Sequence, residues 1–146
     1  MNHLEKLEQY LTNNALKMTD QRKTILESLA DLSTHFTLEE LLEAVQRKRN
    51  GIGQATLYRT MRLFVDAGLV DEHRFDDGVT RYEVQDDDTH HDHLICLSCG
   101  KIIEFEDEFI EQRQEALAQQ YGMRITTHKM ELYGHCLDKV ACKSRT

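Results

Sequence analysis

The first half of the chain carries apolar residues at helical spacing in four separate segments. They recur at positions 4, 7 and 11, at 25, 26 and 29, at 38, 41, 42 and 45, and at 57, 61, 64 and 65. Thr19 stands where it would cap the second helix, and Thr37 and Glu40 can form a capping box for the third. Gly68 is placed to end the fourth helix. The pattern therefore predicts four helices before residue 69.

Two strand-like segments follow the fourth helix. Residues 69–75 and 79–84 are separated by Asp76-Asp77-Gly78, and Asp-Gly between two such segments is typical of a β-hairpin. A winged helix-turn-helix consists of helices followed by a β-hairpin, with a short break before its last helix. The predicted elements have this order, with the break at Gly51-Ile52-Gly53. The sequence therefore predicts a winged helix-turn-helix domain over residues 1–85.

The charge run Asp86-Asp87-Asp88 predicts a solvated hinge at residues 86–88, and the pattern changes after it. Short strands are predicted at 93–96 and 101–105, and a longer one at 123–136. Between them, residues 107–121 predict a helix with Phe109, Ile110 and Leu117 facing inward. The predicted fold class is α+β, with an N-terminal winged helix-turn-helix followed by a small α/β domain. Open sheet edges in so small a domain favour pairing with a second copy.

Charge and hydropathy then narrow the possible partners. The net charge is −8, but residues 44–65 contain five basic residues and no acidic one. A local basic patch on an acidic protein is compatible with binding DNA. No apolar segment approaches the ~20 residues that span a bilayer, and residues 1–16 do not resemble a signal peptide. We therefore expect a cytoplasmic protein, with no membrane partner and with its cysteines reduced.

Residues 90–99 concentrate three imidazoles, one carboxylate and two thiols. Imidazole and carboxylate suit iron, zinc and manganese, whereas paired thiolates suit zinc or iron–sulfur clusters. On a strand, His91 and His93 would face one side, and His90 and Asp92 the other, so one strand can supply two sites. Partners by residue type are Glu83, Glu104, Glu111, His128 and His35. Each of these, taken alone, is more often a solvated surface group.

The four cysteines form two pairs, Cys96-x-x-Cys99 and the more widely spaced Cys136 and Cys142. Folding could bring the pairs together as a closed four-thiolate zinc site. Two alternatives stay open: only the first pair binds metal, or all four side chains are small apolar residues. The absence of a surrounding βαβ pattern argues against a thioredoxin-type redox pair.

The basic segment includes a predicted helix at 54–66, with Tyr58 and Arg59 in its first turns. Recognition helices present such positions to base edges, and arginine can pair with guanine through two hydrogen bonds. The alternative for this segment alone is a surface helix with a buried tyrosine.

Three motifs together resemble the ferric uptake regulator family: Ala55-Thr56-Leu57-Tyr58-Arg59, the segment from His90 to Gly100, and Tyr133-Gly134-His135-Cys136. The resemblance extends over residues 16–142. It implies a metal-dependent transcriptional repressor, with a DNA-binding domain at 1–85 and a metal-binding dimerisation domain at 89–146. When loaded with Fe²⁺, such a protein would bind AT-rich palindromic operators of iron-uptake genes as a homodimer or tetramer.

The resemblance also implies three metal sites and a set of DNA contacts. The regulatory site, in which Mn²⁺ or Zn²⁺ can replace Fe²⁺, would consist of His35, Glu83, His91, His93 and Glu104. The second site would consist of His90, Asp92, Glu111 and His128. The structural Zn²⁺ site would consist of Cys96, Cys99, Cys136 and Cys142. The DNA contacts would be Lys17, Tyr58 and Arg59.

Two positions distinguish branches of that family. Peroxide-sensing members characteristically have Asp where this chain has Glu83 and Glu104, and zinc uptake regulators often have Cys in place of Glu83. Both features favour the iron-sensing branch. A zinc- or manganese-sensing member is the alternative, since nitrogen and oxygen ligands accept all three metals. A metalloenzyme is the alternative of a different class, but the sequence lacks an HExxH motif and the basic helix would go unexplained. The segment between Cys136 and Cys142 has one residue more than the commoner family spacing.

Overall fold

The computed structural model describes residues 2–85, 92–140 and 142, and it divides the chain into two compact units at residues 87 and 88. Unit 1 covers Met1–Asp87 and unit 2 covers Asp88–Thr146. The predicted hinge at 86–88 lies outside the described residues, as do His90 and His91.

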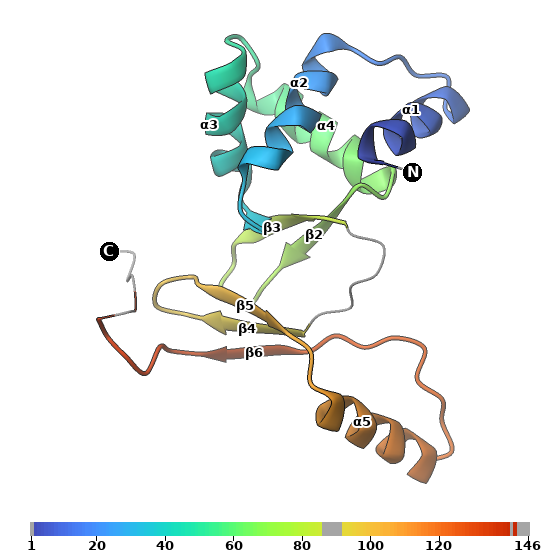
Figure 1. Cartoon of the computed structure of the whole chain (residues 1–146), viewed down its shortest axis with the longest axis vertical. Coiled ribbons are helices and arrows are strands. Elements are labelled where there is room, and N and C mark those ends of the chain that lie inside the picture. Colours follow the sequence, from blue (N-terminus) through green and yellow to red (C-terminus); the bar gives the residue numbers. More distant parts are fainter. Residues whose placement is uncertain (1, 86–91, 141, 143–146) are drawn as a thin grey trace. The chain divides into compact units, whose positions relative to one another are not determined.

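Unit 1 contains four helices and a three-stranded sheet (Figure 1). In chain order its elements are α1 (His3–Asn13), α2 (Asp20–Ser28), the 3₁₀ turn η1 (Leu29–Asp31), β1 (His35–Phe36), α3 (Leu38–Lys48), α4 (Gln54–Asp66), β2 (Val70–Arg74) and β3 (Thr80–Val84).

The helix starts follow the predicted capping chemistry. Thr19 accepts a hydrogen bond from the backbone N–H of Arg22 at the start of α2. At the start of α3, Thr37 and Glu40 form the predicted capping box. Gly68 follows α4 with a φ of 75°, a backbone conformation that a side chain disfavours. These residues satisfy backbone groups that a helix leaves without partners at its ends.

The apolar stripes of the helices meet in one core, as their spacing predicts. The helices contribute to it the buried residues Leu7, Leu11, Ile25, Leu41, Val45, Leu57, Met61 and Phe64. Together with the hairpin β2–β3, this packing confirms the predicted winged-helix fold of the N-terminal part.

The sheet of unit 1 has the order β1-β3-β2, so a third strand joins the predicted hairpin. β1 has only two residues, too short to show the alternation that identifies a strand in a sequence. It nevertheless places His35 directly opposite Glu83 on the central strand β3. One face of the sheet packs on the core through Phe36, Val70 and Tyr82.

Unit 2 contains β4 (Asp92–Cys96), β5 (Ile102–Phe105), α5 (Glu108–Gln120) and β6 (Glu131–Gly134). The sheet has the order β5-β4-β6, with β4 antiparallel to β5 and parallel to β6. Asp107 caps α5 by accepting hydrogen bonds from the backbone of Phe109 and Ile110. The mixed α+β class is therefore as predicted.

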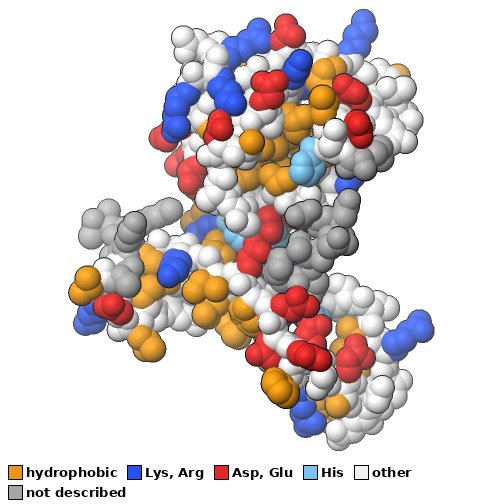
Figure 2. All heavy atoms as spheres, viewed as in Figure 1, with side chains coloured by type: hydrophobic (Ala, Val, Ile, Leu, Met, Phe, Trp, Pro, Cys, Tyr) orange, Lys and Arg blue, Asp and Glu red, His pale blue; other side chains and the backbone are white. Residues whose placement is uncertain are grey.

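Two predictions for unit 2 were wrong. The strand predicted at 123–136 is confined to β6, and α5 has no buried residue. Phe109 is 83% exposed and Leu117 40% exposed, and Figure 1 shows α5 beyond the end of β5 instead of across the sheet. Hydrophobic side chains are correspondingly visible on the surface of this unit in Figure 2. Apolar spacing shows that a helix has a face to cover but does not show what covers it.

Candidate metal centres and DNA interface

The four cysteines, which come from β4, the turn after it and the C-terminal segment, meet in unit 2. The sulfur atoms of Cys96 and Cys142 are 3.8 Å apart, as are those of Cys99 and Cys136, and all four lie within 4.8 Å of one another. A tetrahedral zinc ion with Zn–S bonds of ~2.3 Å has sulfur–sulfur edges of roughly 3.8 Å. The geometry and the donor set therefore fit a closed zinc site, and the longer spacing of the second pair does not prevent Cys142 from reaching it.

Hydrogen bonds within this cluster shift the pKa values of two of its thiols in opposite directions. The pKa of the Cys96 thiol falls to about 5, chiefly because the backbone N–H of Cys99 donates to its sulfur, with smaller contributions from Cys136 and Ser98. The pKa of Cys136 rises to about 12, because hydrogen bonds with the Cys96 and Cys142 sulfurs stabilise its protonated form. Cys96 is thus set to bind as a thiolate, and Cys136 keeps its proton until a cation replaces it.

A second cluster in unit 2 joins β4, α5 and the segment before β6. The Nε2 atom of His128 lies 3.2 Å from Asp92 Oδ1 and 3.9 Å from Glu111 Oε1. The Asp92 side chain is 1% exposed, and the three ligand atoms of this cluster lie within 4.8 Å of one another. One imidazole and two carboxylates suit Zn²⁺, Fe²⁺ or Mn²⁺. The structure brings these three predicted residues together, whereas His90 lies outside the described residues.

His93 and Glu104 form a third group of potential ligands within unit 2. They are directly opposite each other on the antiparallel strands β4 and β5, so their side chains share one face of the sheet. His93 is 8% exposed and follows Asp92 directly. Adjacent strand residues face opposite sides, so β4 presents Asp92 to the cluster with His128 and His93 to the face that carries Glu104.

Within unit 1, the sheet β1-β3-β2, which includes the hairpin β2–β3 of the wing and is called the wing sheet below, brings His35 and Glu83 together. The His35 Nε2 atom lies 3.4 Å from Glu83 Oε2, and the two side chains are 7% and 17% exposed. A third side chain, His73 of β2, approaches the same oxygen with its Nε2 atom at 3.1 Å. His73 has no metal-ligand motif around it. Only the alternation of β2 and the register of the hairpin could have shown that it shares a face with Glu83.

The predicted DNA contacts lie on the surface of unit 1. Tyr58 is 53% exposed in the early turns of α4, which excludes the alternative of a buried tyrosine. Arg59 is exposed beside it, and Lys17 is exposed in the segment between α1 and α2. The side chains are therefore accessible to a nucleic acid.

The basic patch of residues 44–65 is less positive in the folded protein than in the sequence. Lys48 forms an ion pair with Asp31 at 3.1 Å, and Arg62 forms one with Glu72 at 3.7 Å. Part of the charge of the patch is therefore neutralised locally, and Arg59 lies within the remaining part.

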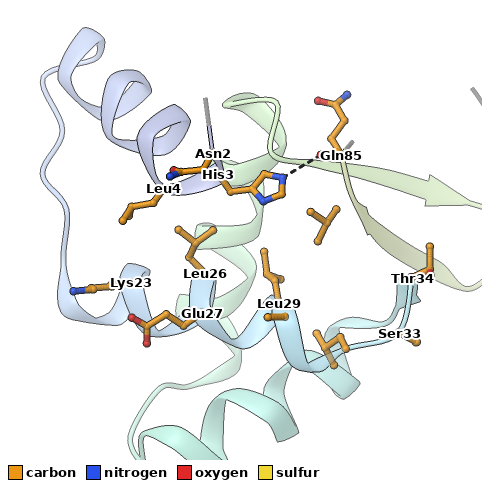
Figure 3. A pocket seen from close by; sticks show the side chains of 13 residues that line it. Asn2, His3, Leu4, Lys23, Leu26, Glu27, Leu29, Ser33, Thr34 and Gln85 are labelled. Carbon is orange, nitrogen blue, oxygen red and sulfur yellow. Dashed lines mark hydrogen bonds between the residues drawn. The ribbon is translucent and has the colours of Figure 1, made fainter. Parts of the chain in front are cut away.

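Unit 1 also contains a pocket of about 720 Å³ between α1, α2 and the end of β3 (Figure 3). Leu4, Leu26 and Leu29 line it, and the His3 ring donates to the Gln85 carbonyl oxygen over 3.1 Å at its edge. One imidazole and one carboxylate in the lining are fewer ligands than a metal site requires.

A winged helix with an exposed Tyr-Arg pair, together with a sheet unit that gathers thiols, imidazoles and carboxylates, defines a metal-responsive transcription regulator. Comparison with known proteins gives the particular family. The chain belongs to the ferric uptake regulator family, whose model matches residues 13–133. It is a metal-dependent transcriptional repressor and not an enzyme. Within the described parts of both units, no helix has the length and hydropathy to cross a membrane.

Individual relatives match over most of their length. The chain is 44% identical to the ferric uptake regulation protein of Vibrio anguillarum over 92% of this chain and 90% of that protein. The Helicobacter pylori ferric uptake regulator, whose structure has three functional metal-binding sites, matches with a TM-score of 0.87 and 30% identity over 97% of this chain and 94% of its own. A zinc-bound manganese uptake regulator matches with a TM-score of 0.73 and 42% identity over 90% of this chain and 99% of its own.

Proposed function

We propose that the protein represses iron-uptake genes in the cytoplasm by binding AT-rich palindromic operators as a homodimer loaded with Fe²⁺. The observation that carries this proposal is that each unit holds a pair of nitrogen and oxygen ligands. These pairs are His35 with Glu83 in unit 1 and His93 with Glu104 in unit 2. Two ligands alone are too few for a stable site, so a metal ion that takes both pairs, with His91, would tie the winged helix to the other unit.

The metal would act by reducing the freedom of the two winged helices. Two recognition helices bind successive major grooves only when they are about 34–36 Å apart. A metal-bound state with a fixed separation would bind DNA more tightly, and DNA would tighten metal binding by the same factor. Tyr58 and Arg59 would contact base edges, and Lys17 the minor groove.

The surface of unit 2 supports a homodimer. Leu94, Ile103 and Leu132 on the strands are 39–45% exposed, and Phe109 of α5 is 83% exposed. β5 and β6 are the edge strands of this sheet. Exposed apolar patches and open strand edges are typical of surfaces that another chain covers. We propose that residues 89–146 form the dimerisation domain and residues 1–85 the DNA-binding domain, joined by a hinge at 86–88.

The other two clusters would have separate roles. The four cysteines would hold a structural Zn²⁺ ion that stabilises unit 2, since such sites contribute directly to folding. Asp92, Glu111 and His128, with His90, would form a second N/O site for a divalent metal.

The second candidate function is regulation of manganese uptake. It is favoured by the 42% identity to a manganese uptake regulator. The same donor atoms accept Fe²⁺ and Mn²⁺, so availability in the cell and not ligand type would separate the two functions.

The test measures operator affinity against metal concentration. Fluorescence anisotropy of a labelled AT-rich palindrome would be followed anaerobically with Fe²⁺, Mn²⁺ and Zn²⁺, using protein that retains its structural zinc. We expect Glu83→Ala and His93→Ala to abolish the metal response equally, because each removes one ligand of a shared site. Glu8→Ala, which removes an exposed carboxylate from α1, is the matched control.

Operator affinity that is independent of metal would refute the mechanism. A loss confined to one of the two ligand variants would refute a shared site. A response to Mn²⁺ at concentrations about tenfold below those required for Fe²⁺, a difference of ~1.4 kcal/mol, would favour the manganese regulator.

A further inference from the structure

The carboxylate of Glu83 lies between two imidazoles of the wing sheet. Glu83 is on the central strand β3, opposite His35 of β1 on one side and Asp71 of β2 on the other. His73 stands two residues after Asp71, on the same face of the sheet. Its Nε2 atom is 3.1 Å from Glu83 Oε2, the oxygen that His35 Nε2 approaches at 3.4 Å. Both contacts are formed entirely within unit 1.

The ring of His73 is held in place by the turn of the wing. It stacks on Phe75 with a centroid separation of 5.8 Å and an interplanar angle of 6°. Phe75 is 2% exposed, and the guanidinium of Arg81 lies 5.7 Å from its ring centroid. Arg81 is in turn held by Asp77 in the hairpin turn, at 2.8 Å. The contact with Phe75 orients the ring so that its Nε2 atom faces Glu83.

We propose that His73 is a positioning residue, which holds the Glu83 carboxylate in the orientation that binds the regulatory metal without binding the metal itself. This inference rests on the proposed role of Glu83 as a ligand. A histidine that binds metal uses the lone pair of the coordinating nitrogen, so His35, once bound through Nε2, cannot also donate to Glu83 from that atom. His73, with a proton on Nε2, can still donate to the carboxylate. Hydrogen bonds of this kind fix the orientation of ligating carboxylates.

The consequence is a measurable loss of metal affinity when the donor is removed. Loss of a group that orients a ligand weakens metal binding by about 10–100-fold. His73→Leu removes the donor and keeps an apolar side chain against Phe75. His73→Gln retains an N–H donor of similar reach and is the conservative control.

The experiment titrates the full-length, zinc-containing protein with Mn²⁺ and follows the paramagnetic resonance of the free ion. All variants carry His128→Ala, so that binding reports on the regulatory site. We expect His73→Leu to raise the Kd by about 10–100-fold and His73→Gln to restore most of the affinity. In a Glu83→Ala background, His73→Leu should have no additional effect, because its action depends on that carboxylate.

The outcomes separate this inference from the function on which it rests. Unchanged Mn²⁺ affinity in Glu83→Ala would overturn the role of Glu83 as a ligand, and with it the proposed regulatory site. A loss in Glu83→Ala without a loss in His73→Leu would overturn only the positioning role. Equal losses in His73→Gln and His73→Leu, or an undiminished effect of His73→Leu in the Glu83→Ala background, would also overturn it. Thermal unfolding and bound zinc that match the parent protein would exclude a folding defect.

Discussion

Replacement of Cys142 by serine tests whether the C-terminal segment closes the thiolate cluster. The Cys142 sulfur is 3.8 Å from that of Cys96, although 45 residues separate the two positions in the chain. If all four sulfurs bind one ion, the variant keeps three thiolates and an open coordination position. We therefore expect zinc to remain bound but to exchange readily with a chelator.

The magnitude follows from the energetics of closed zinc sites. Structural zinc binds peptides with about 10–16 kcal/mol, so an equal share for each of four thiolates is about 2.5–4 kcal/mol. Because ~1.4 kcal/mol corresponds to a factor of ten, the zinc Kd should rise by about two to three orders of magnitude. The free energy of unfolding of zinc-bound unit 2 should fall by a similar amount, about 2.5–4 kcal/mol, because binding of structural zinc is linked to folding.

The assay is competition for zinc with a chromogenic chelator under anaerobic conditions, with thermal unfolding measured in parallel. Val140→Ser is the matched control, because it places a serine in the same segment at a side chain that is 94% exposed. A Kd for Cys142→Ser within a factor of three of the parent value would refute closure by Cys142. The 3.8 Å contact would then be a packing contact between small side chains.

Three further predictions concern pH, the wing and assembly. Cys136 is protonated at neutral pH because its pKa is about 12, so zinc binding should release that proton. The apparent zinc affinity, measured by chelator competition, should therefore rise at least about tenfold per pH unit from pH 6 to 8. An affinity that does not change with pH would contradict this. Burial alone would raise the pKa of Asp77, but hydrogen bonds from Arg81 and the Val79 backbone and the charge of Arg81 lower it below 3.8. Asp77→Asn should therefore lower the free energy of unfolding in urea at pH 7. The difference from the parent should shrink and vanish as the pH falls below 3.8 and through the lowered pKa of the folded state; a constant difference would refute the ion pair as its source. Phe109→Glu should raise the dimer Kd by about two to four orders of magnitude, because each protomer loses about 1.5–3 kcal/mol from the burial of one Phe side chain. Analytical ultracentrifugation measures this Kd, and the monomer should stay folded. An unchanged Kd would place the interface elsewhere.

Local features of the fold followed directly from the sequence. Thr19, Thr37 and Glu40 cap the helices that their positions predict, because a cap depends only on residues within one turn. The apolar stripes predicted the core of unit 1 for a similar reason, since helical periodicity is fixed by backbone geometry. The Asp-Gly turn likewise predicted the hairpin that places Glu83 on a strand.

Features that depend on distant contacts were not predictable from the sequence. β1 exists because two residues pair with β3, and neither residue carries a strand pattern of its own. The proximity of His73 to Glu83 likewise depends on the register of the hairpin. The four cysteines are the exception, because their residue type and the family resemblance predicted the cluster that the structure forms. Phe109 was assigned to the interior because its spacing is helical, but in the isolated chain it is exposed.

The distribution of ligand types between the units explains how one small protein could have both a permanent and a responsive metal. All four thiols lie within unit 2 and can complete a tetrahedral zinc site without a ligand from unit 1. A metal bound there stabilises unit 2 and does not link it to unit 1. A ligand can shift a conformational equilibrium only by its difference in affinity between the two states. Under the proposed function, the regulatory metal has this difference because it binds both ligand pairs in one state and only one pair in the other. Harder nitrogen and oxygen donors exchange metal more readily than four thiolates. The regulatory site would therefore sense the metal, and the four-cysteine site would stabilise the fold.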